Sequence, residues 1–298
     1  MVMHMLRKGI IMTAGAGTRL WPLTHSVNKQ MLPIYDKPMI YYPLTQLMKA
    51  DVRDILIITS AYDLEVYQTL LQDGSQWGIN ISFAVQEKLC GIADAFLIGE
   101  QFIGRDNVVL LLGDNIFHGG NVDCSLKKAL NNTSGATVFA YPVEDPSQFG
   151  VIAFNENGKP VSIEEKPQCP KSQYAVTGLY YYDNYVIDIA KSLKPSARGE
   201  LEITDVNSAY LHKKNLEVEI LNQKTTWLDA GTSASLLAAA NFIHTTEAKL
   251  GIKIGCPEET AWRLGFINDE ALIVAANRYA KNHYGQYLLK LLAGSAAC

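Results

Sequence analysis

The chain has 298 residues, of which 48% are hydrophobic and 19% charged, and its formal net charge is −4. This length can bury one large α/β core or two modest ones. The mild negative charge gives no electrostatic reason to expect a nucleic-acid polymer as partner, and no segment approaches the roughly 20 apolar residues that a membrane helix needs. We therefore expect a globular protein that binds neither nucleic acid nor membrane.

The five cysteines are scattered and odd in number, and no two of them form a C-x-x-C pair. A disulfide framework or a zinc site needs paired or clustered cysteines. The pattern therefore predicts free thiols and a cytoplasmic location. The cysteines are Cys90, Cys124, Cys169, Cys256 and Cys298.

The first half of the chain alternates between two kinds of segment. Apolar, strand-like runs occur at residues 9–13, 54–60, 80–85 and 108–113. Helix-like stretches lie between them at about 38–50, 63–72 and 91–101. This rhythm predicts a mainly parallel sheet with helices on both faces. Ligands of such sheets bind beyond the carboxyl ends of the strands.

The second half changes character. It is β-rich at residues 136–142, 150–154, 161–165 and 175–182, and Asn157-Gly158 between two of these runs is typical of a hairpin. We expect an antiparallel elaboration here. A helix is predicted at 201–214, a strand at 216–221, an extended piece ending at Asp229, and helices at about 233–249 and 269–280.

A loop of small residues follows the first strand and ends in Thr18-Arg19. Small side chains let backbone amides approach a phosphate closely. The loop is neither a Walker A loop nor a G-x-G-x-x-G dinucleotide fingerprint. The competing interpretation is a tight turn that binds nothing. Arg19, and Lys29 further on, favour phosphate binding, although either could be a solvated surface charge.

Two aspartates follow strand-like runs, Asp114 after residues 108–113 and Asp229 after Trp227-Leu228. A carboxylate at the end of a buried strand is unfavourable unless it is paired or bound to a metal. Two together would hold Mg²⁺ and leave positions for phosphate oxygens. The alternative for each is a helix N-cap, although Thr232 or Ser233 is better placed than Asp229.

Glu165 and Lys166 end the run at 161–165, where they could bind sugar hydroxyls and a sugar phosphate, or simply form a charged strand end. The six histidines have no metal-ligand spacing, and no serine lies in a G-x-S-x-G motif. The sequence offers no basis for acyl transfer or thiol catalysis.

Taken in order, these motifs resemble the sugar nucleotidyltransferases, and among them the glucose-1-phosphate thymidylyltransferases. The resemblance runs from about residue 8 to 293. It rests on Gly17-Thr18-Arg19-Leu20, Lys29-Gln30-Met31-Leu32-Pro33-Ile34-Tyr35-Asp36-Lys37-Pro38-Met39-Ile40-Tyr41-Tyr42-Pro43, Leu112-Gly113-Asp114-Asn115, Phe139-Ala140-Tyr141-Pro142-Val143, Glu164-Glu165-Lys166-Pro167, Tyr174-Ala175-Val176-Thr177-Gly178-Leu179-Tyr180, Gly199-Glu200-Leu201-Glu202-Ile203-Thr204-Asp205-Val206 and Trp227-Leu228-Asp229.

The resemblance implies an α/β fold with a Rossmann-like, mainly parallel mixed sheet, a β-rich sugar-binding elaboration and C-terminal helices. It implies one domain over residues 1–298. Its nucleotide-binding half would cover about 8–135, its sugar-phosphate-binding part about 136–231 and its helical C-terminal part about 232–298.

The implied reaction joins dTTP and α-D-glucose 1-phosphate into dTDP-glucose and pyrophosphate, as the first step of dTDP-deoxysugar (rhamnose) biosynthesis. The implied cofactor is Mg²⁺ on Asp114 and Asp229. Related enzymes are homotetramers, inhibited by dTDP-rhamnose at a second site.

The resemblance also implies site residues. Catalytic roles would fall to Arg19, Lys29, Asp114 and Lys166. The nucleotide would contact Ala14, Gly15, Gly17, Thr18, Arg19, Gln30, Gln86 and Gly91. The sugar phosphate would contact Asn115, Gly150, Glu165, Lys166, Val176, Tyr180, Thr204 and Trp227.

Four positions depart from the usual family pattern: Ala14 replaces a glycine, Ala16 a hydroxyl residue, Cys90 an aspartate and Ala230 a threonine. If position 14 needs a positive φ, an alanine there is strained by order 1 kcal/mol. Weaker nucleotide binding would follow. The alternatives left open are a uridylyltransferase, a transferase for another sugar 1-phosphate, and a non-catalytic nucleotide-sugar binder.

Overall fold

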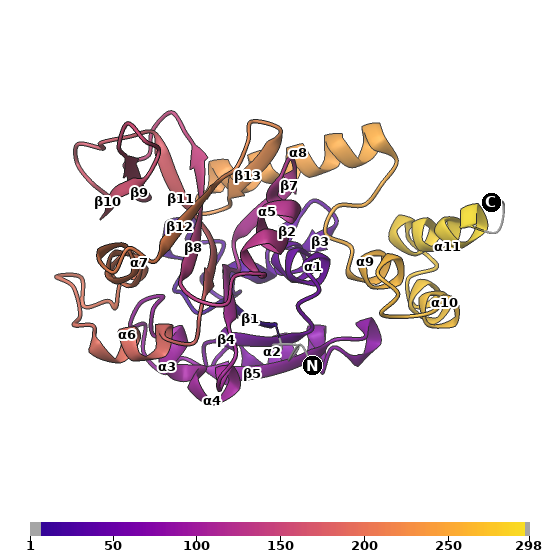
Figure 1. Cartoon of the computed structure of the whole chain (residues 1–298). Coiled ribbons are helices and arrows are strands. Elements are labelled where there is room, and N and C mark those ends of the chain that lie inside the picture. The colour runs from indigo at the N-terminus through magenta and orange to yellow at the C-terminus, as the bar shows by residue number, and fades with distance from the viewer. Residues whose placement is uncertain (1–6, 296–298) are drawn as a thin grey trace, which may run out of the picture.

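The computed structural model describes residues 7–295 (Figure 1). Within that range nine strands form one mixed sheet, in the order β10-β9-β11-β6-β1-β4-β5, with β8 beside β11 and β12 beside β8. Cys298 lies outside the described residues, and the other four cysteines are free. No helix of the described part is long and apolar enough to cross a bilayer.

The parallel half of the sheet consists of β1 (Lys8–Met12), β4 (Asp54–Thr59), β5 (Asn80–Val85) and β6 (Val108–Leu112). Successive side chains of a strand point to opposite faces. Ile11 therefore packs in one core and Ile10 in the other, and both are fully buried. Burial on both faces explains the uninterrupted apolar runs, and the four predicted strands are confirmed.

Helices cover both faces of the nine-stranded sheet. On one face lie α1 (Tyr41–Lys49), α2 (Leu64–Leu71) and α5 (Val122–Ala129). On the other lie α3 (Ala95–Ile98), α4 (Glu100–Ile103), α6 (Val186–Ser192) and α7 (Ile203–His212). The single helix predicted over 91–101 is instead two short ones that meet at Gly99. α5 and α6 were not predicted.

The other half contains β8 (Ala136–Pro142), β9 (Gly150–Phe154), β10 (Pro160–Glu165), β11 (Tyr174–Tyr182) and β12 (Leu216–Ile220). β11 runs antiparallel to β6 and so joins the halves into one sheet. The predicted hairpin at Asn157-Gly158 links β9 and β10, and Gly158 has a φ of +71°. One pairing differs from the expected antiparallel pattern, because β12 lies parallel to β8.

Two small sheets stand outside this one. β7 (Asn115–Gly119) pairs with β13 (Thr225–Asp229), and β2 (Pro33–Ile34) with β3 (Lys37–Pro38). Short 3-10 turns occur at Thr18–Leu20, Lys29–Met31 and Ser75–Trp77. The sequence predicted neither hairpin β2–β3 nor strand β7.

The chain ends in helices. α8 (Ser233–Leu250) starts at Thr232, whose side chain and that of Ser235 cap each other's backbone amides. α9 (Pro257–Arg263), α10 (Asp269–Arg278) and α11 (His283–Ser295) follow. These three gather at the right of Figure 1, away from β9 and β10, and α9 packs on α1.

Candidate functional site

A cavity of about 380 Å³ opens at the carboxyl ends of β1 and β6. The loops that follow these two strands both line it, as the sheet rule predicts. All eight residues of the predicted nucleotide-binding set lie in its wall, together with Lys29 and Asp114. The other lining residues are Met12, Ala16, Leu89, Ile92, Leu112, Glu200 and Gly231.

The small-residue loop is held at both ends. The amides of Thr13 and Ala14 donate to the carbonyl of Ile58 on the neighbouring strand, at 2.8 and 3.1 Å. Gly17 has a φ of +57°, and its carbonyl accepts from the Thr24 hydroxyl at 2.7 Å. Ala14 does not have a positive φ. The strain that an alanine at position 14 could have introduced is therefore absent.

Lys29 is fixed by the residue before it. Asn28 is buried, and its Nδ2 donates to the Thr13 carbonyl at 3.3 Å and to Asp63 at 2.8 Å. The hydroxyl of Tyr67 donates to Asn28 Oδ1 at 2.7 Å. The Lys29 side chain is only 9% exposed, and its ammonium pairs with Asp114. A fixed cation thus lies in the cavity wall.

The pairing of β7 with β13 brings the two aspartates together. Asn115 stands opposite Asp229 in the register, and the amide of Ala230 donates to the Asp114 carbonyl at 3.1 Å. A side chain built on Gly231 would meet Asp229 Oδ1 at 3.2 Å and Arg19 Nη2 at 3.0 Å. The side chains of Arg19 and Asp229 therefore both lie next to Gly231. Asp229 is not a helix cap, since Thr232 takes that place.

The pKa values of Asp114 and Asp229 are shifted in opposite directions. Burial opposes ionisation of Asp114, but the Lys29 ammonium and the Asn115 amide hold its pKa below the usual range. Burial and the negative charge of Asp114 raise the pKa of Asp229 to about 6, against the opposing pull of Lys29 and Arg19. Burial and the charge of Asp114 together therefore outweigh the effect of the nearby cations on the ionisation of Asp229.

The raised pKa of Asp229 predicts that Asp229→Asn stabilises the metal-free protein to an extent that depends on pH. The folded-state pKa of Asp229 lies above its unfolded value, so ionisation destabilises the fold progressively between pH 4 and 6. An amide is free of that penalty, and we expect a gain of about 2 kcal/mol above pH 6.

The measurement is thermal unfolding in EDTA at several pH values. The difference between Asp229→Asn and the unaltered protein should shrink as the pH falls from 6 towards 4. A gain that does not depend on pH would contradict the assignment of the raised pKa to Asp229.

The predicted sugar-phosphate set does not line this cavity, but it begins next to it. Asn115 Nδ2 donates to Asp114 Oδ1 at 2.9 Å. Asn115 Oδ1 accepts from the Gly178 amide at 2.9 Å and from Trp227 Nε1 at 2.6 Å. A side chain at Gly178 would stand 2.6 Å from Asn115, so only glycine fits. Asn115 thus connects Trp227 to the carboxylate pair.

Four more members of that set contact each other. Glu165 Oε2 accepts from the Thr204 hydroxyl at 2.6 Å. A side chain at Gly150 would lie 3.2 Å from Thr204 Oγ1, 3.7 Å from Glu165 and 3.8 Å from Val176. Arg198, which the sequence did not single out, reaches Glu165 Oε1 at 3.5 Å. The sequence-predicted residues therefore form a real cluster at the start of β9 and α7.

Lys166 and Tyr180 link this cluster to the aspartates. The positive charge of Lys166 contributes to holding down the pKa of Asp229, and the Lys166 side chain is 47% exposed. Tyr180 is buried, and burial together with the charges of Glu165 and Asp114 raises its pKa. Tyr180 thus lies close enough to Glu165 and to Asp114 for both charges to affect its ionisation.

Two residues of the predicted nucleotide-binding set, Gln86 and Gly91, are held in place by their neighbours. Gln86 Nε2 donates to the Gly91 carbonyl at 3.2 Å and to Asp94 at 2.8 Å. Gly91 has a φ of +97°, and a side chain there would meet the Leu201 carbonyl at 2.5 Å. Gln30 also lines the cavity, and its buried Oε1 has no hydrogen-bond partner among the residues that the structure describes. This acceptor is available to a ligand.

The chain is similar to known proteins over most of its length. A family model described as nucleotidyl transferase matches residues 8–246. The chain belongs to the nucleotidyl transferase family. It is 58% identical over 285 residues to a glucose-1-phosphate thymidylyltransferase of Neisseria meningitidis, covering 96% of this chain and 99% of that protein. The corresponding enzyme of Mycolicibacterium smegmatis is 54% identical with the same coverage.

Solved nucleotidyl transferases have the same fold. A crystal structure assigned as a glucose-1-phosphate thymidylyltransferase of Bacillus anthracis, in complex with a sucrose, aligns with a TM-score of 0.74 and 42% identity, covering 79% of this chain and 94% of that one. A UDP-glucose pyrophosphorylase complexed with UDP-glucose aligns with a TM-score of 0.70 and 26% identity, covering 81% of this chain and 100% of that one. The predicted α/β fold class is confirmed.

Members of the nucleotidyl transferase family generally use a divalent metal ion. Among the described residues no group of three or more His, Cys, Asp or Glu side chains could hold one alone. The two buried carboxylates Asp114 and Asp229 fit a hard cation that completes its coordination with phosphate oxygens and water. The raised pKa of Asp229 fits the same interpretation, because a bound cation would relieve the repulsion from Asp114.

Sequence reasoning missed some residues of this nucleotidyl transferase site. Leu89 and Ile92 line the cavity but look like ordinary apolar residues in the sequence. Glu200 also lines it and lies within one of the motifs that carry the family resemblance, so that its position was available as a signal. Asn28 gave no signal, because its role depends on partners just after β1, on α2 and in the loop before α2.

Proposed function

We propose that the protein transfers a thymidylyl group from dTTP to α-D-glucose 1-phosphate and forms dTDP-glucose and pyrophosphate. The observation that carries this proposal is the meeting of Asp114, Asp229, Arg19 and Lys29 at the end of a small-residue loop. Two polyanionic substrates react only where their mutual repulsion is neutralised. The names of the similar proteins support the choice of thymidylyl and glucose 1-phosphate.

The nucleotide would bind in the cavity below the loop. The amides of Gly15, Gly17 and Thr18 would face the phosphates. Arg19 and Lys29 would neutralise the α-phosphate and the departing pyrophosphate. Gln86 and Gly91 would contact the thymine, with Gln30 beside it. The hydrogen bonds that hold Gln86 support this role, because a rigid amide discriminates between bases better than a mobile one.

The sugar phosphate would bind on the other side of Asp114. Lys166 would hold its phosphate, and Glu165 would accept hydrogen bonds from sugar hydroxyls. Thr204 fixes the orientation of Glu165, and Asn115 fixes that of Trp227. Gly150, Val176 and Tyr180 would complete the wall.

The reaction balances without a proton transfer. A phosphate oxygen of glucose 1-phosphate forms a P–O bond to the α-phosphorus of dTTP. The bond from that phosphorus to the bridging oxygen breaks, and pyrophosphate leaves with the electron pair. Since the nucleophile is already an anion, no general base is required. Catalysis then consists of positioning and charge neutralisation by the surrounding side chains.

We propose Mg²⁺ as the metal, held by Asp114 and Asp229. When bound, it would supply positive charge to the triphosphate oxygens. Lys29 and Arg19 approach the same carboxylates, so the protein cations and the metal would act on one region of the nucleotide.

A pyrophosphate-release assay tests the proposal. Release should require dTTP, glucose 1-phosphate and Mg²⁺ together, and omission of any one should abolish it. UTP belongs in the panel, because a UDP-glucose pyrophosphorylase has a similar fold. Faster turnover with UTP would favour uridylyl transfer, and binding without release would favour a non-catalytic binder.

The replacement of the usual loop glycine by Ala14 predicts little effect on binding. Since Ala14 lacks a positive φ, restoring glycine relieves no backbone strain. We expect Ala14→Gly to change the dTTP dissociation constant by less than about threefold. Isothermal titration at fixed Mg²⁺ measures it, and a larger gain in affinity would mean that the methyl group crowds the nucleotide.

The remaining parts of the proposal concern the protein's setting. We propose a cytoplasmic homotetramer that supplies dTDP-rhamnose biosynthesis and is inhibited by dTDP-rhamnose. Light scattering of the purified protein tests the assembly. Inhibition by dTDP-rhamnose that glucose 1-phosphate cannot overcome would support a second site.

A further inference from the structure

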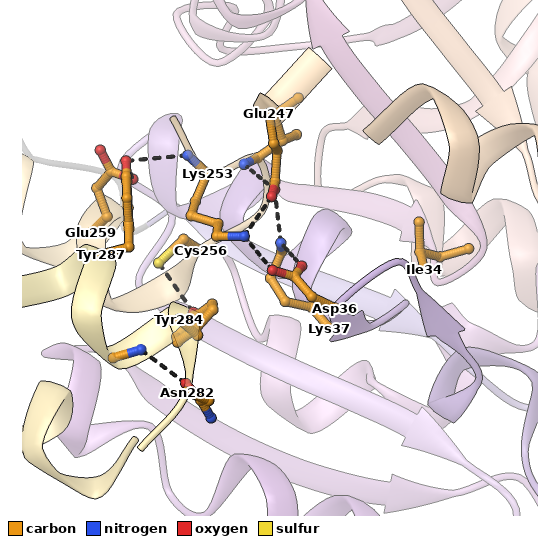
Figure 2. A network of polar contacts seen from close by, with 12 residues as sticks. Ile34, Asp36, Lys37, Glu247, Lys253, Cys256, Glu259, Asn282, Tyr284 and Tyr287 are labelled. Carbon is orange, nitrogen blue, oxygen red and sulfur yellow. Dashed lines mark hydrogen bonds and ion pairs between the residues drawn. The ribbon is translucent and has the colours of Figure 1, made fainter. Parts of the chain in front are cut away.

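Four charged side chains outside the cavity form a closed ring: Asp36, Lys37, Glu247 and Lys253 (Figure 2). The Lys37 ammonium bridges Asp36 and Glu247, with 2.8 Å to Glu247 Oε1. The Lys253 ammonium bridges the same two carboxylates, with 2.7 Å to Glu247 Oε2. Each of the four carboxylate oxygens in the ring therefore pairs with one ammonium group.

The ring is electrically neutral, and three of its side chains are at most 10% exposed, whereas that of Asp36 is 25% exposed. The Lys37 side chain is 1% exposed, and that of Glu247 4% exposed. Burial of a charge is tolerated only when its partners and hydrogen bonds are complete. Glu247 Oε1 also accepts from the Ile254 amide at 2.8 Å. Removal of one member would leave a charge without its partner, so the four side chains hold their positions together.

The ring joins three distant parts of the chain. Asp36 and Lys37 belong to the hairpin β2–β3, Glu247 to the last turn of α8, and Lys253 to the connector that leads to α9. None of these four residues lines the cavity at the candidate active site. The proposed function therefore gives the ring no role.

The hairpin is the direct continuation of the segment that carries Lys29. The amide of Met39 donates to the Leu32 carbonyl at 3.0 Å, and that of Ile40 donates to the Gln30 carbonyl at 2.9 Å. The two residues that follow the hairpin are thus hydrogen-bonded to Leu32, which precedes it, and to Gln30, the residue next to Lys29. A shift of the hairpin would move the backbone of Lys29.

The hairpin tip is strained. Tyr35 has a φ of +61°, which is unfavourable for a bulky residue and persists only where the surroundings impose it. Its ring packs against His244 with centroids 4.7 Å apart, and the Lys253 ammonium lies 5.3 Å from the ring centre. The residues around the Tyr35 side chain thus hold the tip in a conformation that it would otherwise leave.

We propose that this charged ring is the positioning device for Lys29: it clamps the hairpin to α8 and the C-terminal connector and so holds the Lys29 ammonium on Asp114. This inference rests on the proposed role of Lys29 in thymidylyl transfer. Asn28 anchors the segment on its N-terminal side, and the ring anchors it on its C-terminal side. Asp36, Lys37, Glu247 and Lys253 are positioning residues that do not touch substrate.

The test uses Asp36→Asn in the full-length protein, because Asp36 is the more exposed of the two carboxylates and the change keeps its size. We expect kcat to fall about 10- to 100-fold, the range caused by a misplaced catalytic group. KM for both substrates should stay within about threefold. Hydrogen exchange of amides 30–40 should accelerate, while that of β5 should not change.

A double-mutant cycle separates positioning from general loss of stability. In a Lys29→Ala background, Asp36→Asn should slow turnover by less than about twofold, because the group that it positions is already absent. Lys253→Gln should reproduce the defect from the C-terminal side, and Lys253→Arg should restore most of kcat. Lys249→Gln is the matched control, since Lys249 is exposed on the last turn of α8 and outside the ring.

The outcomes are distinct. Additive losses from Asp36→Asn and Lys29→Ala, or an unchanged kcat in Asp36→Asn, would overturn the positioning role. If Lys29→Ala itself keeps full turnover, the proposed function of Lys29 fails regardless of the ring. If Asp36→Asn does not fold, Lys253→Gln and Lys253→Arg decide the matter by the same cycle, and equal turnover of these two would count against the inference.

Discussion

Asp114→Asn is expected to lower kcat by about 1,000-fold, which corresponds to about 4 kcal/mol of transition-state stabilisation. The carboxylate of Asp114 pairs with Lys29, accepts from Asn115 and faces Asp229. An amide of the same size can still fill the space, but it carries no charge to bind a divalent ion or to hold the ammonium. The measurement is steady-state pyrophosphate release at saturating dTTP and glucose 1-phosphate.

The matched control for this prediction is Asp51→Asn. Asp51 is an exposed aspartate that pairs with Arg53 just before the amino end of β4, at the opposite edge of the sheet from the cavity. The Asp51→Asn variant loses the same charge as Asp114→Asn, but at a position far from the proposed substrate site. Near-normal turnover of Asp114→Asn at ordinary Mg²⁺ concentrations, with the control also unaffected, would remove Asp114 from the metal site.

The parallel core and its binding edge could be predicted from the sequence, because the physics there is local. A strand segment that is buried on both faces must be apolar, as β6 is throughout and β1 is from Gly9 to Met12. The loops that follow such strands must meet at one edge of the sheet, and this rule alone predicts that Arg19 and Asp114 share one cavity, as they do. The division of the chain into three functional parts stays a prediction.

Other features depend on contacts between distant residues and left no local signal. β7 is a short strand whose partner is β13, more than a hundred residues away in the sequence, and their pairing is what brings Asp229 to Asp114. The charged ring is a stronger case. Asp36 and Lys253 are 217 residues apart, and each looks like an ordinary surface charge in the sequence. The ring forms only because α8 and the connector pack on the hairpin.

The predicted roles of Lys29 and Lys166 differ because their surroundings differ. Lys29 is buried, paired and anchored on both sides, which suits a cation that must act at one fixed point. Lys166 is half exposed and has a φ of +43°, with its amide donating to the Phe149 carbonyl at 3.0 Å. The backbone of Lys166 is fixed, while its half-exposed ammonium makes only a long contact, 3.8 Å, with Glu165 Oε1, a residue of the predicted sugar-phosphate set.

Lys166→Ala should therefore raise KM for glucose 1-phosphate about 10- to 100-fold, because one charge-assisted hydrogen bond to a phosphate contributes roughly 1.5–3 kcal/mol. KM for dTTP should change by less than about threefold, since Lys166 does not line the nucleotide cavity. Initial rates measured with one substrate varied and the other saturating give both constants.

Lys171→Ala is the matched control, because Lys171 is a more exposed lysine of the same region whose ammonium pairs with Glu164 instead. It should leave both constants unchanged. The charge of Lys166 also contributes to holding down the pKa of Asp229, so its loss should raise that pKa further and shift the pH dependence of kcat upwards. An equal rise in KM for both substrates would mean that Lys166 acts on the shared carboxylate pair rather than on the sugar phosphate.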